Sequence, residues 1–295
     1  CRDEEGDNAF SASSDDSIEA AVGFARECAA KLDADTRFYA TTDAIQDLDA
    51  VRAALGATQV DMVGISYGTR VAQQYAKRYP AQTRSVVLDG VVPNALVLGS
   101  EHAKNLEASL DLQFARCAQD KLCAERFGSP RANLDALFAR LRGAPLPVSY
   151  RDPVSGEQKQ EDFGPGDLAA VVRLFAYAPP VAAMLPLALH EAAEGRPQDL
   201  LAQSRMLTGG IGESIMHGMQ LSVMCAEDAP ELKPDPADAQ TTLGNAIIEV
   251  TLAQCAAWPH GERPADFRAP LAGEVPTLLL SGEFDPVTPP RYGEQ

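Results

Sequence analysis

Residues 64–68 read Gly-Ile-Ser-Tyr-Gly and match the pattern G-x-S-x-G. In this pattern the serine occupies a tight turn between a strand and a helix, where its hydroxyl is presented as a nucleophile. The neighbouring residues fit that position, because residues 60–64 read as a short strand and an amphipathic helix follows until Pro80. We therefore interpret Ser66 as a candidate nucleophile. The alternative is an ordinary glycine-rich turn with a solvent-facing serine.

The residues around the serine have separate roles in such a turn. Gly64 and Gly68 are expected where side chains would collide as the helix folds back on the strand. Tyr67 would open the helix, so its backbone N–H would lie near the oxyanion that forms on an attacked carbonyl. The sequence thus predicts an acyl-transfer site with Tyr67 as one oxyanion-hole donor.

A serine nucleophile needs a base, and the base needs an orienting carboxylate. In the architecture that uses G-x-S-x-G, the chain order is serine, acid, histidine. Asp285 is the preferred acid because it follows an apolar strand at 275–280, in a turn rich in Gly and Pro. Asp89 also ends a strand and is the second choice. A turn-forming aspartate before proline is the structural alternative for Asp285.

The expected histidine is missing from the required position. All four histidines of the chain, His102, His190, His217 and His260, precede Asp285. No His-Gly or Gly-Gly loop that could give a second oxyanion donor precedes the serine motif. We therefore expect the catalytic histidine and this donor outside the chain, which would then be truncated at both ends.

The order of the predicted elements indicates an α/β fold. Residues 41–90 alternate helix, strand, helix, strand, which implies a parallel sheet with right-handed crossovers and helices on both faces. We expect a core at 1–95, a mostly helical cap inserted at 96–270, and the rest of the core at 271–295. Residues 147–150 are the one weak strand candidate in the cap. The helices expected there span 101–127, 131–142, 166–178, 181–195, 212–224 and 236–256.

Six cysteines, an even number, fit either disulfides or buried free thiols. Fifteen pairings are possible. Our hypothesis is the local one, which pairs Cys1 with Cys28, Cys117 with Cys123, and Cys225 with Cys255. Three disulfides would indicate an oxidising compartment.

Composition excludes several classes of protein. Hydrophobic residues make up 45% of the chain, as in globular proteins, which argues against a disordered protein. Lys and Arg number 25 against 42 Asp and Glu, so the net charge of −17 disfavours nucleic acid as a partner. The sequence contains no run of about 18 apolar residues, so no membrane-spanning helix is expected. No metal-ligand spacing or cofactor motif is present, so no cofactor is expected.

Several motifs resemble a known family. They are residues 39–43, 47–52 and 55–56 leading into 64–70, the run Ser-Gly-Glu-Phe-Asp-Pro-Val-Thr-Pro at 281–289, and the cap segments 223–228, 255–258 and the Cys117/Cys123 loop. Together they resemble the tripeptidyl aminopeptidase branch of the α/β-hydrolase fold, which is related to proline iminopeptidases. The resemblance implies a Ser–His–Asp triad with Ser66 and Asp285. It also implies an interior window of a longer protein, since members carry an oxyanion loop before this region and a Gly-His turn after it.

The resemblance also suggests a substrate. Relatives that trim free N-termini hold the substrate ammonium with acidic side chains of the cap, which implies that Glu227 and Asp228 bind it here. The alternative for these two residues is a solvated acidic pair before Pro230.

Three functions remain open at this point. The first is a secreted or periplasmic serine exopeptidase that releases short peptides or single residues from free peptide N-termini through an acyl-enzyme. The second is a carboxylesterase or lipase-like hydrolase on the same fold, and the third is a non-catalytic pseudo-hydrolase. The sequence does not indicate the length of peptide released or the oligomeric state.

Overall fold

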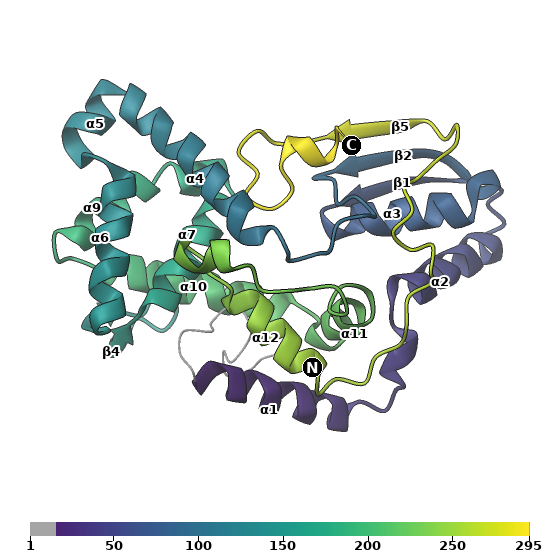
Figure 1. Ribbon diagram of the computed structural model, residues 1–295, viewed down its shortest axis with the longest axis horizontal. Coiled ribbons are helices and arrows are strands. Elements are labelled where there is room, and N and C mark those ends of the chain that lie inside the picture. Colours follow the sequence, from purple (N-terminus) through teal and green to yellow (C-terminus); the bar gives the residue numbers. More distant parts are fainter. Residues whose placement is uncertain (1–15, 295) are drawn as a thin grey trace.

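The computed structural model describes residues 16–294, without the side chains of residues 16–17 and 208–214. A parallel sheet lies at one end of the molecule and a helical unit at the other (Figure 1). The sheet contains β1 (Val60–Ile65), β2 (Thr83–Asp89) and β5 (Thr277–Leu280), in the order β1-β2-β5. The predicted parallel sheet is confirmed.

The register of this sheet brings the strand ends together. Ile65 lies opposite Asp89, and Asp89 lies opposite Leu280. The carboxyl ends of all three strands therefore meet at one edge, although β1 and β5 are more than 200 residues apart in the sequence. Open α/β sheets place their functional sites at this edge.

One helix forms the main cover of the sheet. Helix α3 (Tyr67–Arg78) packs on β1 and β2, and its Ala72 and Ala76 contact a small core with Val86 and Leu88. Helix α2 (Thr41–Ala54) packs in turn against α3.

The expectation of helices on both faces of the sheet is met only in part. On the opposite face of β1, Val63 and Ile65 are 69% and 66% exposed among the described residues. The same face of β1 carries the exposed Asp61, so it is apolar only toward the carboxyl end of the strand.

The helical unit occupies most of the middle of the chain, and α1 (Asp16–Lys31) packs beside its last helix. An antiparallel hairpin of β3 (Leu146–Arg151) and β4 (Gln158–Phe163) interrupts it. The helices are α4 (His102–Gln119), α5 (Lys121–Phe127), α6 (Pro130–Gly143), α7 (Pro165–Ala176), α8 (Pro179–Ala182), α9 (Leu185–Ala193), α10 (Gln198–Ser214), α11 (His217–Glu227) and α12 (Ala246–Cys255). Short 3-10 turns span Thr36–Phe38, Pro80–Gln82, Pro236–Gln240 and Pro290–Tyr292.

Several predictions for this unit were wrong in detail. The helix expected at 236–256 starts only at Ala246, after a 3-10 turn, and the one expected at 181–195 is divided between α8 and α9. Strand β4 was missed because its sequence, QKQEDF, carries five polar residues and no apolar alternation. The helix expected at 101–127 breaks at Asp120, whose side chain accepts the Cys123 N–H (2.8 Å) and caps α5. Helix α10 was missed because the glycines within 209–212 have low helix propensity. It runs through these glycines to Ser214, so the helix expected at 212–224 starts only at His217.

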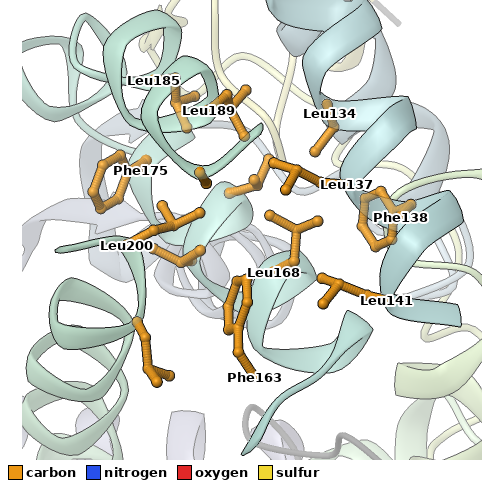
Figure 2. Packing of buried hydrophobic residues seen from close by; sticks show 14 of the residues in the cluster. Leu134, Leu137, Phe138, Leu141, Phe163, Leu168, Phe175, Leu185, Leu189 and Leu200 are labelled. Carbon is orange, nitrogen blue, oxygen red and sulfur yellow. The ribbon is translucent and has the colours of Figure 1, made fainter. Parts of the chain in front are cut away.

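The helical unit has its own apolar core (Figure 2). Leu168 of α7 lies at its centre, with Leu137 and Leu141 of α6 and Leu200 of α10 around it. All four side chains are almost completely buried. Burial of this apolar surface stabilises the folded helical unit.

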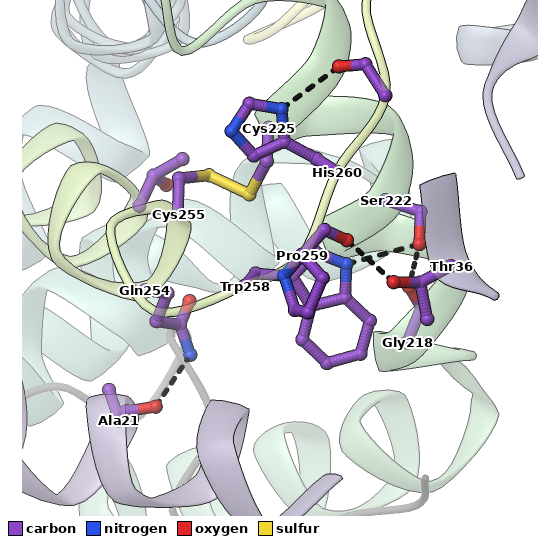
Figure 3. Close-up of a disulfide and its surroundings, with 12 residues drawn as sticks. Ala21, Thr36, Gly218, Ser222, Cys225, Gln254, Cys255, Trp258, Pro259 and His260 are labelled. Atoms are coloured by element: carbon purple, nitrogen blue, oxygen red, sulfur yellow. Dashed lines mark hydrogen bonds between the residues drawn. A yellow bond between two sulfur atoms is a disulfide. The ribbon is translucent and has the colours of Figure 1, made fainter. Parts of the chain in front are cut away.

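Two disulfides lie outside this core. The structure forms Cys117–Cys123 and Cys225–Cys255, as local pairing predicts. The second lies beside Trp258, whose indole N–H donates to the Ser222 hydroxyl at 3.1 Å (Figure 3). The predicted partner of Cys28, Cys1, lies outside the described residues. In the part of the chain that the structure describes, no helix is long and apolar enough to cross a membrane.

The core of the helical unit yields a test of its packing. Leu168→Ala should lower the free energy of unfolding by about 2–5 kcal/mol, because it opens a cavity among fully buried neighbours. Urea unfolding followed by circular dichroism measures this. Leu187→Ala on α9 is the control, since Leu187 is 44% exposed and its loss should cost little. Equal losses in the two variants would contradict the packing described.

Candidate active site

Ser66 occupies a strained turn between β1 and α3. Its backbone angles are φ 53° and ψ −122°, and it is the one non-glycine residue with positive φ among the described residues. Such a conformation costs of order 1–3 kcal/mol and persists only where neighbours enforce it. The Ser66 N–H donates to the Asp89 carbonyl at 2.8 Å, which fixes the turn to the end of β2. The Ser66 side chain is exposed at the carboxyl edge of the sheet.

The two glycines of the motif differ in their surroundings. A Cβ on Gly64 would lie 2.3 Å from the Gly68 carbonyl oxygen, so no side chain fits there and the expected role of Gly64 is confirmed. A Cβ on Gly68 would meet nothing within 4 Å, so the expected clash at Gly68 was wrong. The close approach is one-sided because Gly64 faces the helix backbone, whereas Gly68 faces open space.

Thr69 was not recognised from the sequence, yet it braces the same turn. It is fully buried, and its hydroxyl donates to the Ser66 carbonyl (2.6 Å) while accepting the Val92 N–H (2.8 Å). One side chain therefore ties the start of α3 to the chain that leaves β2. Its burial follows from the fold, so no local pattern in the sequence identifies it.

Asp285 lies in a tight loop after β5. One carboxylate oxygen accepts the N–H groups of Val287 and Thr288, both at 2.8 Å, and the other accepts the Thr288 hydroxyl at 2.8 Å. Gly90, the residue after β2, has φ +66°, and a Cβ on it would lie 3.7 Å from Asp285 Oδ2. Asp285 is therefore beside the strand that neighbours the serine turn. Asp89, the second choice, is exposed and contacts Ser66 through its backbone.

Helix α4 of the cap holds the Asp285 loop. The buried Asn105 donates to the Val287 carbonyl (2.8 Å) and to the Tyr292 hydroxyl (2.9 Å). Ser109, one turn further, donates to the Phe284 carbonyl at 2.7 Å. These contacts fix the loop on both sides of its aspartate, so the cap helps to position the candidate acid.

Glu227 ends α11 and is completely buried. Its Oε1 accepts the Thr41 N–H at the start of α2 (2.6 Å). Its Oε2 lacks a hydrogen-bond donor and lies 3.7 Å from an Arg70 nitrogen. Burial raises the pKa of Glu227 to about 7, with the Thr41 hydrogen bond and the charge of Arg70 opposing that rise. At neutral pH the Glu227 side chain is therefore partly protonated and partly charged.

Asp228 differs from Glu227 although it is the next residue. One of its oxygens accepts from Arg70 (2.8 Å), and the other accepts from Arg268 (3.0 Å) and from the Leu98 N–H (2.8 Å). Arg70 and Asp228 are both fully buried. Asp228 is therefore saturated by partners within the chain, and it joins helix α3 of the core to helix α11 of the cap.

Tyr67 presents two groups near the serine. As the first residue of α3, it has a backbone N–H without an acceptor inside the helix. Its hydroxyl shares a hydrogen bond of 2.5 Å with the Thr41 hydroxyl. Desolvation and the nearby charge of Glu227 raise the pKa of this phenol to about 12, so it stays neutral. Thr41 thus connects Tyr67 with Glu227.

The histidines of the chain lie away from the serine. Within the described residues, no hydrogen bond joins any of them to Ser66 or Asp285. His260 is exposed and contacts the Gly261 carbonyl, and the ring of His190 lies 6.0 Å from that of Phe127. His102 and His217 line a cavity between cap helices.

The parallel sheet, the serine turn at its edge and the helical unit between its strands show that this chain has the α/β-hydrolase fold. A family model described as alpha/beta hydrolase fold matches residues 13–125, and one described as TAP-like protein matches residues 240–295. Within this fold, the chain resembles the tripeptidyl aminopeptidases. It is 40% identical over 52 residues to tripeptidyl aminopeptidase of Streptomyces lividans, which covers 18% of this chain and 10% of that protein.

A longer alignment extends the resemblance. Serine protease Hip1 of Mycobacterium tuberculosis is 26% identical over 272 residues, or 86% of this chain and 52% of that protein. The chain therefore spans about half the length of this relative. Among solved structures, MGS-M2, an alpha/beta hydrolase enzyme from a deep-sea metagenome library, aligns with 90% of this chain and 60% of its own at 16% identity. Its TM-score of 0.33 marks a weak superposition.

The glycines of the serine turn provide a paired test. Gly64→Ala should destabilise the protein by roughly 1–3 kcal/mol or more, because the new methyl group meets the backbone of α3. Gly68→Ala should be neutral or stabilise by up to about 1 kcal/mol, because it adds helix propensity in open space. Thermal and urea unfolding of both variants compare them. A Gly64→Ala protein as stable as the wild type would contradict the geometry of the turn.

Proposed function

We propose that this chain belongs to a serine exopeptidase that acts on peptides with a free N-terminus. The observation that carries the proposal is the strained, exposed Ser66 at the edge of the sheet where Asp285 also lies. Strain at one exposed serine, enforced by Gly64 and Thr69, fits a nucleophile better than an ordinary turn. The similarity to tripeptidyl aminopeptidase and to a serine protease supports the same reaction class.

Ser66, Asp285 and Tyr67 each have a distinct role in the proposed reaction. The Ser66 hydroxyl attacks the substrate carbonyl and gives its proton to a histidine from a segment outside this sequence, which Asp285 orients. The Tyr67 N–H donates to the oxyanion of the tetrahedral intermediate. The histidine passes the proton to the leaving amine, the acyl-enzyme forms, and water then releases the acyl product and restores the serine.

Glu227 is the candidate that binds the substrate ammonium. Its Oε2 is buried without a hydrogen-bond donor, so an ammonium that reaches it exchanges its hydration for a charge-assisted hydrogen bond. The link through Thr41 to Tyr67 places Glu227 near the serine turn. Asp228 contributes indirectly, since its contacts with Arg70 and Arg268 hold α11 in place.

We also propose which segments form the core and the cap, and in which compartment the protein acts. Of the expected core, 1–95 and 271–295, the segments 41–95 and 271–294 would form the hydrolase core, and residues 96–270 would form the cap. Helix α1, which was expected in the core, packs against α11 and α12 of the cap. The two disulfides favour a secreted or periplasmic location, because disulfides persist in oxidising compartments.

A substrate panel tests the reaction class. The intact protein should hydrolyse chromogenic amides of tripeptides or single residues with a free N-terminus faster than N-acetylated analogues and simple acyl esters. Ser66→Ala should lower kcat by at least about 10³-fold with an unchanged fold, because it removes the nucleophile. Ser85→Ala, at a partly buried serine that bonds Asp61, is the control and should keep full activity. Preference for the esters would point instead to a carboxylesterase, and activity that survives in Ser66→Ala would refute the proposal.

Glu227 gives the ammonium site a pH signature. An ammonium needs the charged carboxylate, and the pKa of Glu227 is raised to about 7. KM for free-amine substrates should therefore rise as the pH falls from about 8 to about 6, on either side of that pKa, while KM for N-acetylated substrates should not follow. Glu227→Gln should raise KM for the free amines about 10-fold or more and abolish this pH dependence. Glu249→Gln, at an exposed position on α12, is the matched control. Equal effects on free and acetylated substrates would exclude the role.

A further inference from the structure

Thr41 lies where the start of α2 meets the helical unit and the serine turn. It is the first residue of α2 and is completely buried. Its N–H donates to Glu227 Oε1 at 2.6 Å, and its hydroxyl shares a hydrogen bond of 2.5 Å with the Tyr67 hydroxyl. Glu227 belongs to α11 and Tyr67 to α3, so one buried residue connects three helices.

The start of α2 favours a negative charge at Glu227. The first N–H groups of a helix have no acceptor within the helix, and the helix dipole places partial positive charge on them. The Thr41 N–H is one of these groups and donates to the Glu227 carboxylate. The preceding N–H, that of Ala40, is already taken by the side chain of Asp43 at 3.0 Å. Glu227 is therefore held at this helix end through Thr41.

The Thr41 hydroxyl acts on the same carboxylate. The pKa of the Tyr67 phenol is raised to about 12, so the phenol keeps its proton and can donate it to Thr41 Oγ1. The proton of the Thr41 hydroxyl is then available to Glu227, and this hydrogen bond lowers the pKa of the Glu227 carboxyl, as the Thr41 N–H does. Thr41 thus opposes the burial that raises this pKa to about 7.

The other charges around Glu227 come from three directions. Arg70 of α3 lies 3.7 Å from Glu227 Oε2 and favours the charged form, whereas Asp228, the next residue, opposes it. Arg263 and Arg268 approach from the segment after α12 and donate to the Glu227 backbone carbonyl at 3.0 and 2.7 Å. Arg70 and Asp228 also pair with each other, so changing either one alters the joint between two helices.

We propose that Thr41 is a positioning residue that keeps Glu227 charged for the substrate ammonium. This role rests on the function proposed above, in which Glu227 binds that ammonium, and it identifies the residue that sets the working pH range of the site. The Thr41 hydroxyl can be removed without changing any charge around Glu227, so its contribution can be measured by itself.

Direct titration of Glu227 tests the role without a substrate. The intact protein is labelled with ¹³Cδ-glutamate, its carboxyl resonances are followed by NMR from about pH 5 to about pH 9, and the Glu227 resonance is identified by its loss in Glu227→Gln. Thr41→Val should raise the midpoint by about one pH unit, because a hydrogen bond to the charged carboxylate is lost. Thr41→Ala should do the same and keeps the test valid if the valine variant folds poorly.

The conservative variant separates the hydroxyl from the shape of the side chain. Thr41→Ser keeps the hydroxyl and should keep the wild-type midpoint. Thr42→Val is the matched control, since it makes the same exchange at the next, only partly buried position of α2 and should leave the midpoint unchanged. A midpoint that Thr41→Val and Thr41→Ala leave unchanged, or that Thr41→Ser raises equally, would overturn the proposal.

Kinetics distinguishes this role from the peptidase function itself. At pH 7, Thr41→Val should raise KM for free-amine substrates about fivefold, because a smaller fraction of Glu227 is charged, and the ratio to wild type should fall toward one by about pH 9. A merely structural defect would raise KM at every pH and would contradict the role. An NMR midpoint that moves without any change in KM would confirm the effect of Thr41 on Glu227 and refute ammonium binding there.

Discussion

The backbone of Ser66 is the constraint on which the arrangement of the site depends. A residue other than glycine is held at φ 53° because β1 must pass directly into α3 while the serine points away from the sheet. Gly64 allows the helix backbone to approach within a distance that a Cβ would block, and Thr69 ties the turn to the chain after β2. The strain is thus balanced by contacts on both sides of the serine.

Cap and core meet through buried charges and a shared loop. Arg70 of α3 pairs with Asp228, the residue that follows α11, and Arg268 binds the same carboxylate. Removing one partner of such a pair leaves an uncompensated buried charge, which costs about 3–5 kcal/mol. The loop of Asp285 is held from the cap as well, through Asn105. The helical unit therefore holds both the Asp285 loop and helix α3 at the edge of the sheet.

The sequence predicted the features that follow from local pattern. The alternation at 41–90 gave the parallel strands, and G-x-S-x-G placed Ser66 in its turn. Long-range contacts were beyond the same reasoning. Nothing local distinguishes Asp228, saturated by Arg70 and Arg268, from its neighbour Glu227, which keeps an unpaired oxygen. Strand β4 was missed because polar residues fill it, and the support that Asn105 gives to a loop far along the chain leaves no periodic signal.

Covalent labelling tests the central claim, that Ser66 is an activated nucleophile. The intact protein is treated with a fluorophosphonate, which reacts with serines that a base activates, and the adduct is located by peptide mass spectrometry. Our account predicts a single adduct on the peptide that contains Ser66, lost in Ser66→Ala and after denaturation. An adduct on another serine, or labelling that survives in Ser66→Ala, would contradict it.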